Sequence, residues 1–247
     1  MILTAHQPVY LPWLGLFHKI ASADTFVSFD EVQYLPRDWN NRNKIKTASG
    51  AIWLTVPVLT KGHREKPIRE IEINNREPWR RKHWNAISLN YRKAPFFAQY
   101  EEFLRSVYQR EWQWLWELNE HMLRWFLEVL GINVRFLRAS ELGLVGAKSD
   151  VVLDMCRKLG AKTYIFGALG RDYARVEDFQ RAGIEVVFQE YRHPEYSQLH
   201  GAFISHLSLL DLLFNCGPQS LAILTGQTPA RAECDVGPQA AGTSAEV

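Results

Sequence analysis

Side chains able to move protons follow the first two apolar runs of this chain. His6 and Gln7 come directly after ILTA, and Asp30 and Gln33 come after TFVSF. A neutral imidazole can accept a proton from a reacting group, and a nearby carboxylate can orient that imidazole or a substrate hydroxyl. We therefore predict His6 as a catalytic base, Asp30 as its catalytic partner, and the two glutamines as substrate-binding residues. The structural alternatives are a turn histidine and a capping aspartate.

A second histidine with polar neighbours lies near the end of the chain. His193 stands in EYRHPEYSQLHG, after the apolar run IEVVFQ, and Tyr196 and Gln198 follow it closely. This histidine is the other candidate for the catalytic base, with the tyrosine and the glutamine as substrate-binding residues. Asp211 and Asn215 are one helical turn apart, so they can point together into a cleft and are also predicted to bind substrate.

Basic residues suited to phosphate binding occur at two places. Arg42, Lys44 and Lys46 alternate in RNKIK, which is predicted to be a basic loop. If that loop is extended, they lie on one side, and basic side chains there would suit a diphosphate. Lys148 stands at the start of a predicted helix, where a cation is unfavourable unless an anion lies nearby. Ser149 is a candidate cap there. We predict Arg42, Lys46, Lys148 and Ser149 as substrate-binding residues, the alternative being a solvated surface.

The opening segment MILTAHQPVYLPWLGLFHKI supplies the remaining candidates. Tyr10, Trp13 and Lys19 are predicted to bind substrate, although a solvated helix face is the alternative for the lysine. Pro8 and Pro12 stiffen the turn, which lowers the entropy lost when side chains are ordered around a ligand.

The elements that position these residues follow from hydrophobic periodicity. Strands are predicted over 2–5, 25–29, 53–58, 68–73, 134–140, 163–167 and 184–191, and helices over 13–23, 148–159, 175–183 and 201–217, with Gly160 as a C-cap. The helical stripe of residues 79–130 is an insertion. Strands that alternate with helices indicate an α/β fold with a central, mainly parallel sheet in a Rossmann-like layout. The carboxyl ends of such strands share one edge, where ligands bind.

Length and composition limit the possible classes of protein. The 247 residues suit a single α/β domain over 1–225, followed by a tail of residues 226–247 that is predicted to be disordered. A net charge of +2 gives no basic field for nucleic acid. The three cysteines share no short spacing, so no metal motif or disulfide framework is expected. We see no GxGxxG, Walker A, leader or membrane-spanning pattern, and we expect a cytoplasmic protein without membrane insertion.

The sequence resembles the WbqC-like protein family. The resemblance rests on AHQPVYLPWLGLFHKIASADTFVSFDEVQY, NRNKIK, WLTVPV, YRKAPFF, GAKSDVVLDMCRKLGA, EYRHPEYSQLHG and LSLLDLLFNCG, and it runs from residue 1 to about 220. One departure is at Gly167-Ala168, where we expect Ser-Gly in relatives. A weaker similarity of layout alone links the chain to HIGH-type nucleotidyltransferases, whose histidine pair is not matched because His6 and His18 are too far apart.

The resemblance implies a role in bacterial surface-polysaccharide biosynthesis, including O-antigen and lipopolysaccharide. We expect an acyl or aminoacyl transferase, for example a glycyl transferase, that acts on a nucleotide-linked amino sugar. No resident cofactor is predicted; ATP or an acyl-carrier thioester is the candidate co-substrate. The candidate partners are an acyl carrier protein and a second copy of the chain. The alternatives are an acid-activating nucleotidyl-transfer enzyme and a non-catalytic protein that binds nucleotide sugars or acts as a scaffold.

Overall fold

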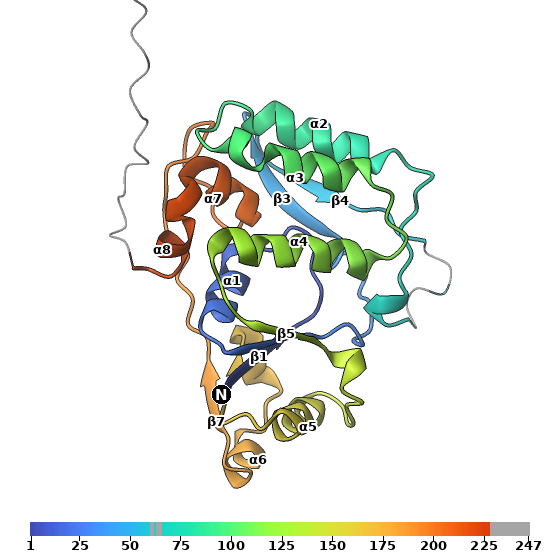
Figure 1. The fold of residues 1–247 in the computed structure, drawn as a ribbon, viewed down its shortest axis with the longest axis vertical. Helices are drawn as coiled ribbons and strands as arrows, with labels where there is room; N and C mark the ends of the chain where they lie inside the picture. Colours follow the sequence, from blue (N-terminus) through green and yellow to red (C-terminus); the bar gives the residue numbers. More distant parts are fainter. Residues whose placement is uncertain (60–61, 63–65, 228–247) are drawn as a thin grey trace, which may run out of the picture.

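The structure is a computed structural model that describes residues 1–59, 62 and 66–227 (Figure 1). The predicted disordered tail therefore lies, from residue 228 onward, outside the described residues.

A five-stranded parallel sheet forms the centre of the molecule. Its strands are β1 (Ile2–His6), β2 (Thr25–Ser28), β5 (Arg135–Arg138), β6 (Thr163–Phe166) and β7 (Glu185–Phe188). Their order in the sheet is β5-β2-β1-β6-β7, and every neighbouring pair is parallel. The strands β2 and β5 therefore lie on one side of β1, and the later strands β6 and β7 lie on its other side. The predicted α/β class and mainly parallel sheet are confirmed, and the order reverses between β1 and β6.

Helices cover both faces of this sheet. On one face lie α1 (Leu14–Ala21) and α4 (Leu115–Leu130), and on the other lie α5 (Ser149–Leu159) and α6 (Val176–Arg181) (Figure 1). Two separate apolar cores result, because the sheet stands between them. Phe17, Phe26 and Phe126 belong to the first core, and Leu3, Met155 and Phe179 belong to the second. The apolar stripe on each helix faces its own core, as the periodicity predicts.

The first core extends into a layer that the sheet does not reach. The predicted insertion forms α2 (Trp79–Tyr91), α3 (Phe97–Gln109) and α4, and Figure 1 shows α4 between the α2–α3 pair and the sheet. A separate antiparallel hairpin of β3 (Arg42–Thr47) and β4 (Gly50–Thr55) lies beside α2. The chain continues through α7 (Leu209–Cys216) and α8 (Ser220–Leu224). Short 3-10 helices cover 68–70, 139–141, 168–172 and 217–219.

Three predicted elements are wrong in extent or type. The basic segment before WLTVPV is not a loop but the strand β3, and the second strand of the hairpin ends at Thr55. The segment 68–73 forms a 3-10 turn and isolated bridges instead of a strand. The last helix begins at Leu209 rather than near residue 201, because the Ser208 hydroxyl caps it by accepting a hydrogen bond from the Leu210 N–H at 3.3 Å. Phe203 and Leu207 therefore lie before the helix.

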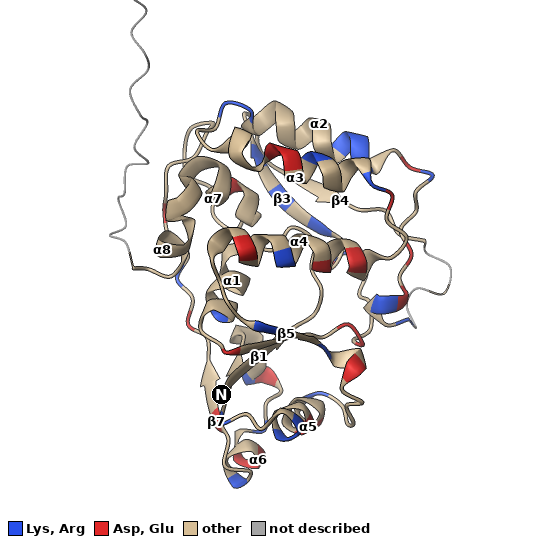
Figure 2. Cartoon of the chain, viewed as in Figure 1, with Lys and Arg blue, Asp and Glu red and all other residues tan. Residues whose placement is uncertain are grey.

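Charged residues are spread over the surface rather than collected on one side. Figure 2 shows basic positions along β3 and at the start of α2, and acidic positions on α3 and α4. Within the described part of the chain, no helix is both long enough and apolar enough to cross a bilayer.

Candidate functional site

The carboxyl ends of the strands bring several predicted residues to one edge of the sheet. His6 is the last residue of β1 and pairs with Ser28 at the end of β2. Gly167 follows β6, and Gln189 follows β7 directly. The crevice between β1 and β6, where the strand order reverses, is the position at which open parallel sheets bind ligands.

Hydrogen bonds to its backbone groups hold the loop after β1 in place. The Asn40 amide donates to the Pro8 carbonyl at 3.0 Å, the Tyr10 N–H donates to the Trp39 carbonyl at 3.1 Å, and the Leu209 N–H donates to the Pro12 carbonyl at 2.8 Å. Leu11 is fully buried with a φ of +46°, in the region that favours glycine. Surrounding contacts must therefore hold this leucine in place, and such conformations cluster at functional sites.

His6 has one ring nitrogen free to accept a proton. Its Nδ1 lies 2.8 Å from the Gln7 carbonyl oxygen, which can only accept, so Nδ1 carries the hydrogen. Nε2 is then the unprotonated nitrogen, and no described residue donates a hydrogen bond to it. Burial, and then the charge of Lys19, lower the pKa of His6 from 6.5 to about 3. The imidazole is thus neutral at physiological pH, with its Nε2 lone pair available.

Lys19 lies under the end of β1 and is only 4% exposed. Its ammonium donates to the Ala5 carbonyl at 2.9 Å, and it has no carboxylate partner among the described residues. Burial lowers the pKa of Lys19 from 10.5 to about 8. A methyl group built on Gly167 would lie 3.9 Å from Nζ, so the ammonium faces the exit of β6. A buried lysine without a counter-ion beside a histidine of lowered pKa is a functional-site signature.

His18 completes this side of the site together with the segment that follows β7. The Gln189 amide donates to the Gly15 carbonyl at 2.8 Å and lies 3.0 Å from His18 Nδ1. Tyr191 packs on His18 with ring centroids 5.1 Å apart, and its buried hydroxyl has no hydrogen-bond partner among the described residues. A side chain on Gly15 would approach Trp13 Nε1 to 2.9 Å and the Tyr191 ring to 3.0 Å, so a larger residue there would have to displace these rings.

Three indole rings lead away from His6 toward the hairpin. The Trp13 ring lies 5.4 Å from His6, Trp39 lies 5.7 Å from Trp13, and Trp53 lies 5.4 Å from Trp39. Arg42 and Lys44 lie over the Trp53 ring, at 4.3 and 4.9 Å from its centroid. Trp53 is 42% exposed. This aromatic ladder of Trp13, Trp39 and Trp53 offers apolar ring surface and positive charge next to the candidate base.

The chain matches the WbqC-like protein family over residues 7–223. It belongs to that family. The uncharacterized protein Rv1507c of Mycobacterium tuberculosis is 37% identical to it over 216 residues, which cover 87% of this chain and 93% of the mycobacterial protein. No solved structure matches the chain.

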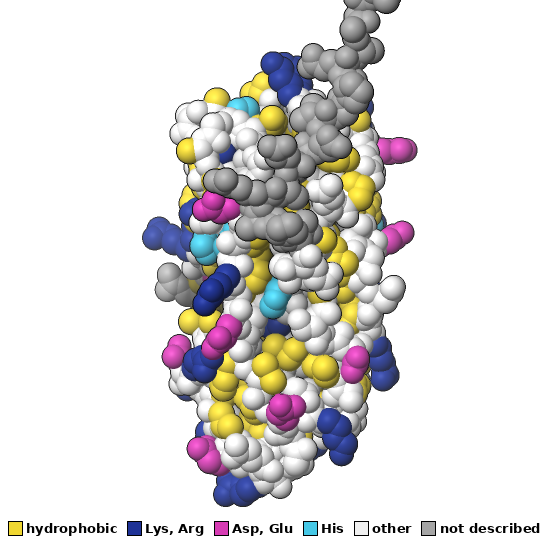
Figure 3. Space-filling view, turned by 90° about the vertical axis from the view of Figure 1, so that its left-hand side faces the viewer, with side chains coloured by type: hydrophobic (Ala, Val, Ile, Leu, Met, Phe, Trp, Pro, Cys, Tyr) yellow, Lys and Arg dark blue, Asp and Glu magenta, His cyan; other side chains and the backbone are white. Residues whose placement is uncertain are grey.

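In this WbqC-like protein, His193 is placed differently from His6. Its Nδ1 lies 2.8 Å from the Pro194 carbonyl, and its Nε2 accepts the His206 N–H at 3.2 Å. Both ring nitrogens are therefore used inside the protein. The His193 ring nonetheless lies 6.0 Å from Tyr191, which contacts His18, so the segment stands beside the site. Figure 3 shows histidine side chains reaching the surface among apolar residues on the face that carries β7, α7 and α8.

The other predicted catalytic residue, Asp30, caps a turn. Its carboxylate accepts the Ser140 N–H at 3.0 Å and the Ser140 hydroxyl at 2.7 Å, and it is only 3% exposed. The structure thus shows the capping arrangement for Asp30. Lys148 is exposed at the start of α5 with a φ of +52°, and the buried Ser149 hydroxyl accepts the Arg175 N–H at 3.0 Å.

A further group of predicted residues holds the segment 196–204 against the protein. The Lys46 ammonium donates to Gln198 Oε1 at 3.0 Å and to the carbonyls of Gly201 and Ala202 at 3.2 and 2.6 Å. Asp211 is fully buried and accepts the Tyr91 hydroxyl at 2.7 Å.

Asn215 and Tyr196 belong to the same packed region. Asn215 accepts the Leu199 N–H at 3.2 Å, and the buried Tyr196 ring packs on Phe203. The prediction that Asp211 and Asn215 open into a cleft is wrong, because α7 is buried on the side that carries them.

The remaining predicted residues lie around the opening loop. Tyr10 is 0% exposed, so it does not line an open surface; its hydroxyl lies 2.6 Å from that of Tyr108 and 2.9 Å from His83 Nδ1. Gln7 donates to Asp38 at 3.3 Å, and Gln33 forms an isolated bridge with Pro67. Gly167 and Ala168 lead into the 3-10 turn after β6.

Sequence reasoning missed the residues that build the scaffold of the site. Asn40 and Asn43 are fully buried and hydrogen-bond the loop after β1, and Gln189 and Tyr191 complete the contact with α1. The repeated asparagines in WNNRN were an available signal, since asparagine side chains often hydrogen-bond backbone groups. Within residues 1–59, 62 and 66–227, no group of three or more histidine, cysteine or acidic side chains could hold a metal ion.

Proposed function

We propose that this WbqC-like protein is an acyl or aminoacyl transferase that modifies a nucleotide-linked amino sugar during surface-polysaccharide biosynthesis. The observation that carries the proposal is the unprotonated Nε2 of His6 at the point where the strand order reverses, beside the buried Lys19. Family membership supports the wider role, because the WbqC-like family is linked to polysaccharide biosynthesis. Such a reaction needs a neutral base next to positive charge.

The proposed reaction forms an amide bond. The amine of the sugar attacks the acyl carbon of an activated donor, and His6 Nε2 takes the proton that the amine loses. The new C–N bond forms as the bond from the acyl carbon to the leaving group breaks, and the histidine returns its proton to that group. An anion bound near Lys19 would offset one cause of the low pKa of His6 and so make the imidazole a stronger base.

The aromatic ladder supplies the binding surface for the substrate. Arg42 and Lys44 would hold the diphosphate, and the Trp39 and Trp53 rings would cover a sugar or base ring. His6 is the base in this proposal rather than His193, because both nitrogens of His193 are already hydrogen-bonded. Asp30 and Lys46 act as scaffold residues, because their polar groups bind the protein itself. Lys148 lies at the exposed N-terminus of α5 as a candidate contact for a second phosphate.

The co-substrate is an acyl-carrier thioester or an acyl group activated by ATP, and the reaction would take place in the cytoplasm, where both occur. The purified chain would be incubated with nucleotide-linked amino sugars and either donor, and the acylated sugar would be detected by mass spectrometry. Exchange of radiolabelled pyrophosphate into ATP, without sugar, would instead favour acid activation by nucleotidyl transfer. Binding of nucleotide sugars without any product would favour the non-catalytic alternative.

The decisive control for the proposal is Lys19→Met. This substitution removes the ammonium and keeps a long apolar side chain in the buried position. We expect transfer to fall together with nucleotide-sugar affinity, because the proposed anion loses its counter-charge. Unchanged transfer in folded Lys19→Met would contradict the assignment of this site.

A further inference from the structure

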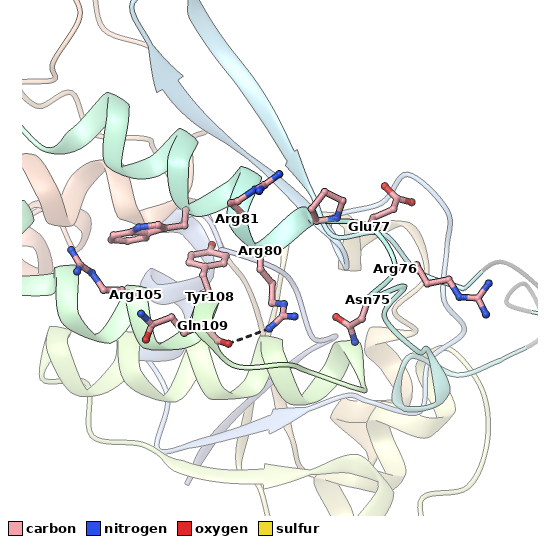
Figure 4. Close-up of a pocket in the computed structure, with 10 residues that line it drawn as sticks. Asn75, Arg76, Glu77, Arg80, Arg81, Arg105, Tyr108 and Gln109 are labelled. Atoms are coloured by element: carbon pink, nitrogen blue, oxygen red, sulfur yellow. Dashed lines mark hydrogen bonds between the residues drawn. The ribbon is translucent and has the colours of Figure 1, made fainter.

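A cleft far from the sheet edge lies between α2 and α3. It has a volume of about 660 Å³, within the range of roughly 300–1,000 Å³ typical of small-molecule sites. The loop before α2, the first turn of α2 and the end of α3 form its walls (Figure 4). Figure 1 places this pair of helices on the other side of α4 from the sheet, so the cleft is separate from the candidate site described above.

Four arginines and one glutamate line this cleft. The arginines are Arg76, Arg80, Arg81 and Arg105, and the acid is Glu77. Arginine presents a planar fork of donors that fits phosphate oxygens in pairs, and no lysine lines the cleft. The walls thus carry an excess of positive charge in a form suited to phosphate groups.

The arginines differ in how far the protein already uses them. Arg80 extends between the helices, donates to the Gln109 carbonyl at 3.1 Å and pairs with the exposed Glu111 at 3.4 Å (Figure 4). Arg105 pairs with Glu101 and lies 5.5 Å from the Trp84 ring centre.

Arg76 and Arg81 make no ion pair with any described residue. Figure 4 shows both extending outward from the rim of the cleft. Neither guanidinium group is neutralised within the described part of the chain, so each can turn toward an anion that enters the cleft.

The start of α2 adds to the positive potential. The first turn contains no acidic residue, and three successive basic residues stand near the start of the helix: Arg80, Arg81 and Lys82. Cations at the positive end of a helix dipole are unfavourable, and a bound anion reverses that effect. An anion in this cleft would relieve repulsion that the free protein carries.

The floor of the cleft is rigid. Tyr108 lines it and is hydrogen-bonded through Tyr10 to His83, all three being buried. Trp84 offers a partly buried ring beside Tyr108, with ring centres 6.4 Å apart. A floor that is already ordered loses little entropy when a ligand binds.

We propose that the α2–α3 cleft is a second binding site, for a small molecule that carries a diphosphate group. More than one arginine is available, which favours two linked phosphates over a single carboxylate. The size of the cleft favours a small ligand over a polymer.

The test measures binding of pyrophosphate and of a nucleoside diphosphate to the full chain by calorimetry. We expect saturable binding of at least one of them, with one molecule in the α2–α3 cleft in addition to any molecule that the sheet edge binds. In Arg80→Gln/Arg81→Gln the affinity should fall by about tenfold or more, as expected for the loss of charged hydrogen bonds. Lys82→Gln is the matched control, because Lys82 is the next residue of the same helix and does not line the cleft; it should bind as the wild type does.

Two further variants keep the result interpretable. Arg76→Gln removes an exposed rim residue that makes no ion pair with a described residue, so it tests the cleft even if the double variant unfolds. Lys19→Met, at the sheet edge, should leave the part of the binding that the cleft arginines support unchanged. Loss of diphosphate binding in Lys19→Met but not in the arginine variants would overturn the proposal, since the sheet edge would then be the diphosphate site. Binding of heparin without saturable binding of either small ligand would overturn it too.

Discussion

The carboxyl end of β1 and the segment 192–206 look alike in the sequence but differ in the structure. His6 stands two residues before Pro8, and His193 stands directly before Pro194. Each histidine lies at or after the end of a strand of the same sheet. At β1, His6 keeps one ring nitrogen free and stands beside an ammonium that no carboxylate of the described residues neutralises. In the later segment, His193 uses both ring nitrogens, and Lys46 of β3 uses its donors on backbone and amide oxygens of that segment.

The difference shows how to separate reactive groups from structural ones. A polar group that has already made its hydrogen bonds would have to break them to bind a ligand, which costs about 1–3 kcal/mol for each buried group left unpaired. A group with an unused donor or acceptor has no such cost. By this criterion the first region is suited to chemistry and the second to support.

The largest expected effect is on turnover, and it comes from removing the base. His6→Ala should fold normally and lower the turnover of the proposed transfer by about 10²–10⁴-fold, with substrate affinity nearly unchanged. The measurement is steady-state kinetics of the proposed reaction, with circular dichroism to confirm folding.

The matched variant in the other region is His193→Gln. Its amide can replace one donor and one acceptor of the ring, so we expect turnover close to that of the wild type. If His193→Gln instead lost turnover as completely as His6→Ala, the two regions would share the chemistry and the comparison would fail.

The second prediction concerns the support that Lys46 gives to residues 198–202. Lys46→Met leaves the Gln198 side chain and the Gly201 and Ala202 carbonyls without their donor. We expect the free energy of unfolding to fall by about 1–3 kcal/mol. Urea denaturation measures this loss. Turnover per folded molecule should persist, and its complete loss in a folded variant would instead indicate that Lys46 contacts the substrate.

The fold was largely predictable, because burial leaves a periodic signal. Residues 2–5 and 163–166 are mostly apolar runs, which indicate buried parallel strands, and the stripe of Leu115, Leu118 and Met122 indicates the inner face of α4. Gly160 ends α5 with a φ of +68°, as expected of a glycine that terminates a helix.

The candidate site was predictable only in part, because its contacts join distant segments. The opening motif led to His6, but nothing near Lys19 indicates that its ammonium is buried against Ala5 and faces Gly167. Asp30 looked like a catalytic residue because Ser140, its partner, stands 110 residues later in the chain. Local pattern therefore identified the residue types, while long-range hydrogen bonds decided which of them remained available.

The third prediction uses the pH dependence of stability. The pKa of His6 is about 3 in the folded protein and 6.5 without that environment. Between these values the unfolded chain binds a proton that the folded chain does not, so stability present above pH 6.5 is lost as the pH falls toward 3. One whole proton corresponds to about 1.4 kcal/mol per pH unit, and solvent contact of the partly buried ring reduces this value.

Urea denaturation at about pH 7.5, 6.5, 5.5 and 4.5 measures how the free energy of unfolding changes with pH. Each step is a tenfold change in proton concentration. We expect His6→Gln to flatten this pH dependence. His193→Gln should flatten it less, since burial lowers the pKa of His193 while its Nδ1–H bond to the Pro194 carbonyl opposes that shift. Equal slopes in His6→Gln and the wild type would show that His6 is solvated rather than desolvated.

The smallest expected effect comes from Cys156, which lies outside both compared regions. Cys156 lies in α5, in the core on the opposite face of the sheet from α1, and it is fully buried. Burial raises the pKa of its thiol to about 12, so the reactive thiolate is scarce. Cys156→Ala should therefore keep turnover and lower the free energy of unfolding by about 1 kcal/mol, through lost apolar contact and a small cavity. Urea denaturation measures the change in the free energy of unfolding, and the transfer assay measures turnover. Abolished turnover in a folded Cys156→Ala protein would point to a thioester on this cysteine and would move the chemistry away from the end of β1.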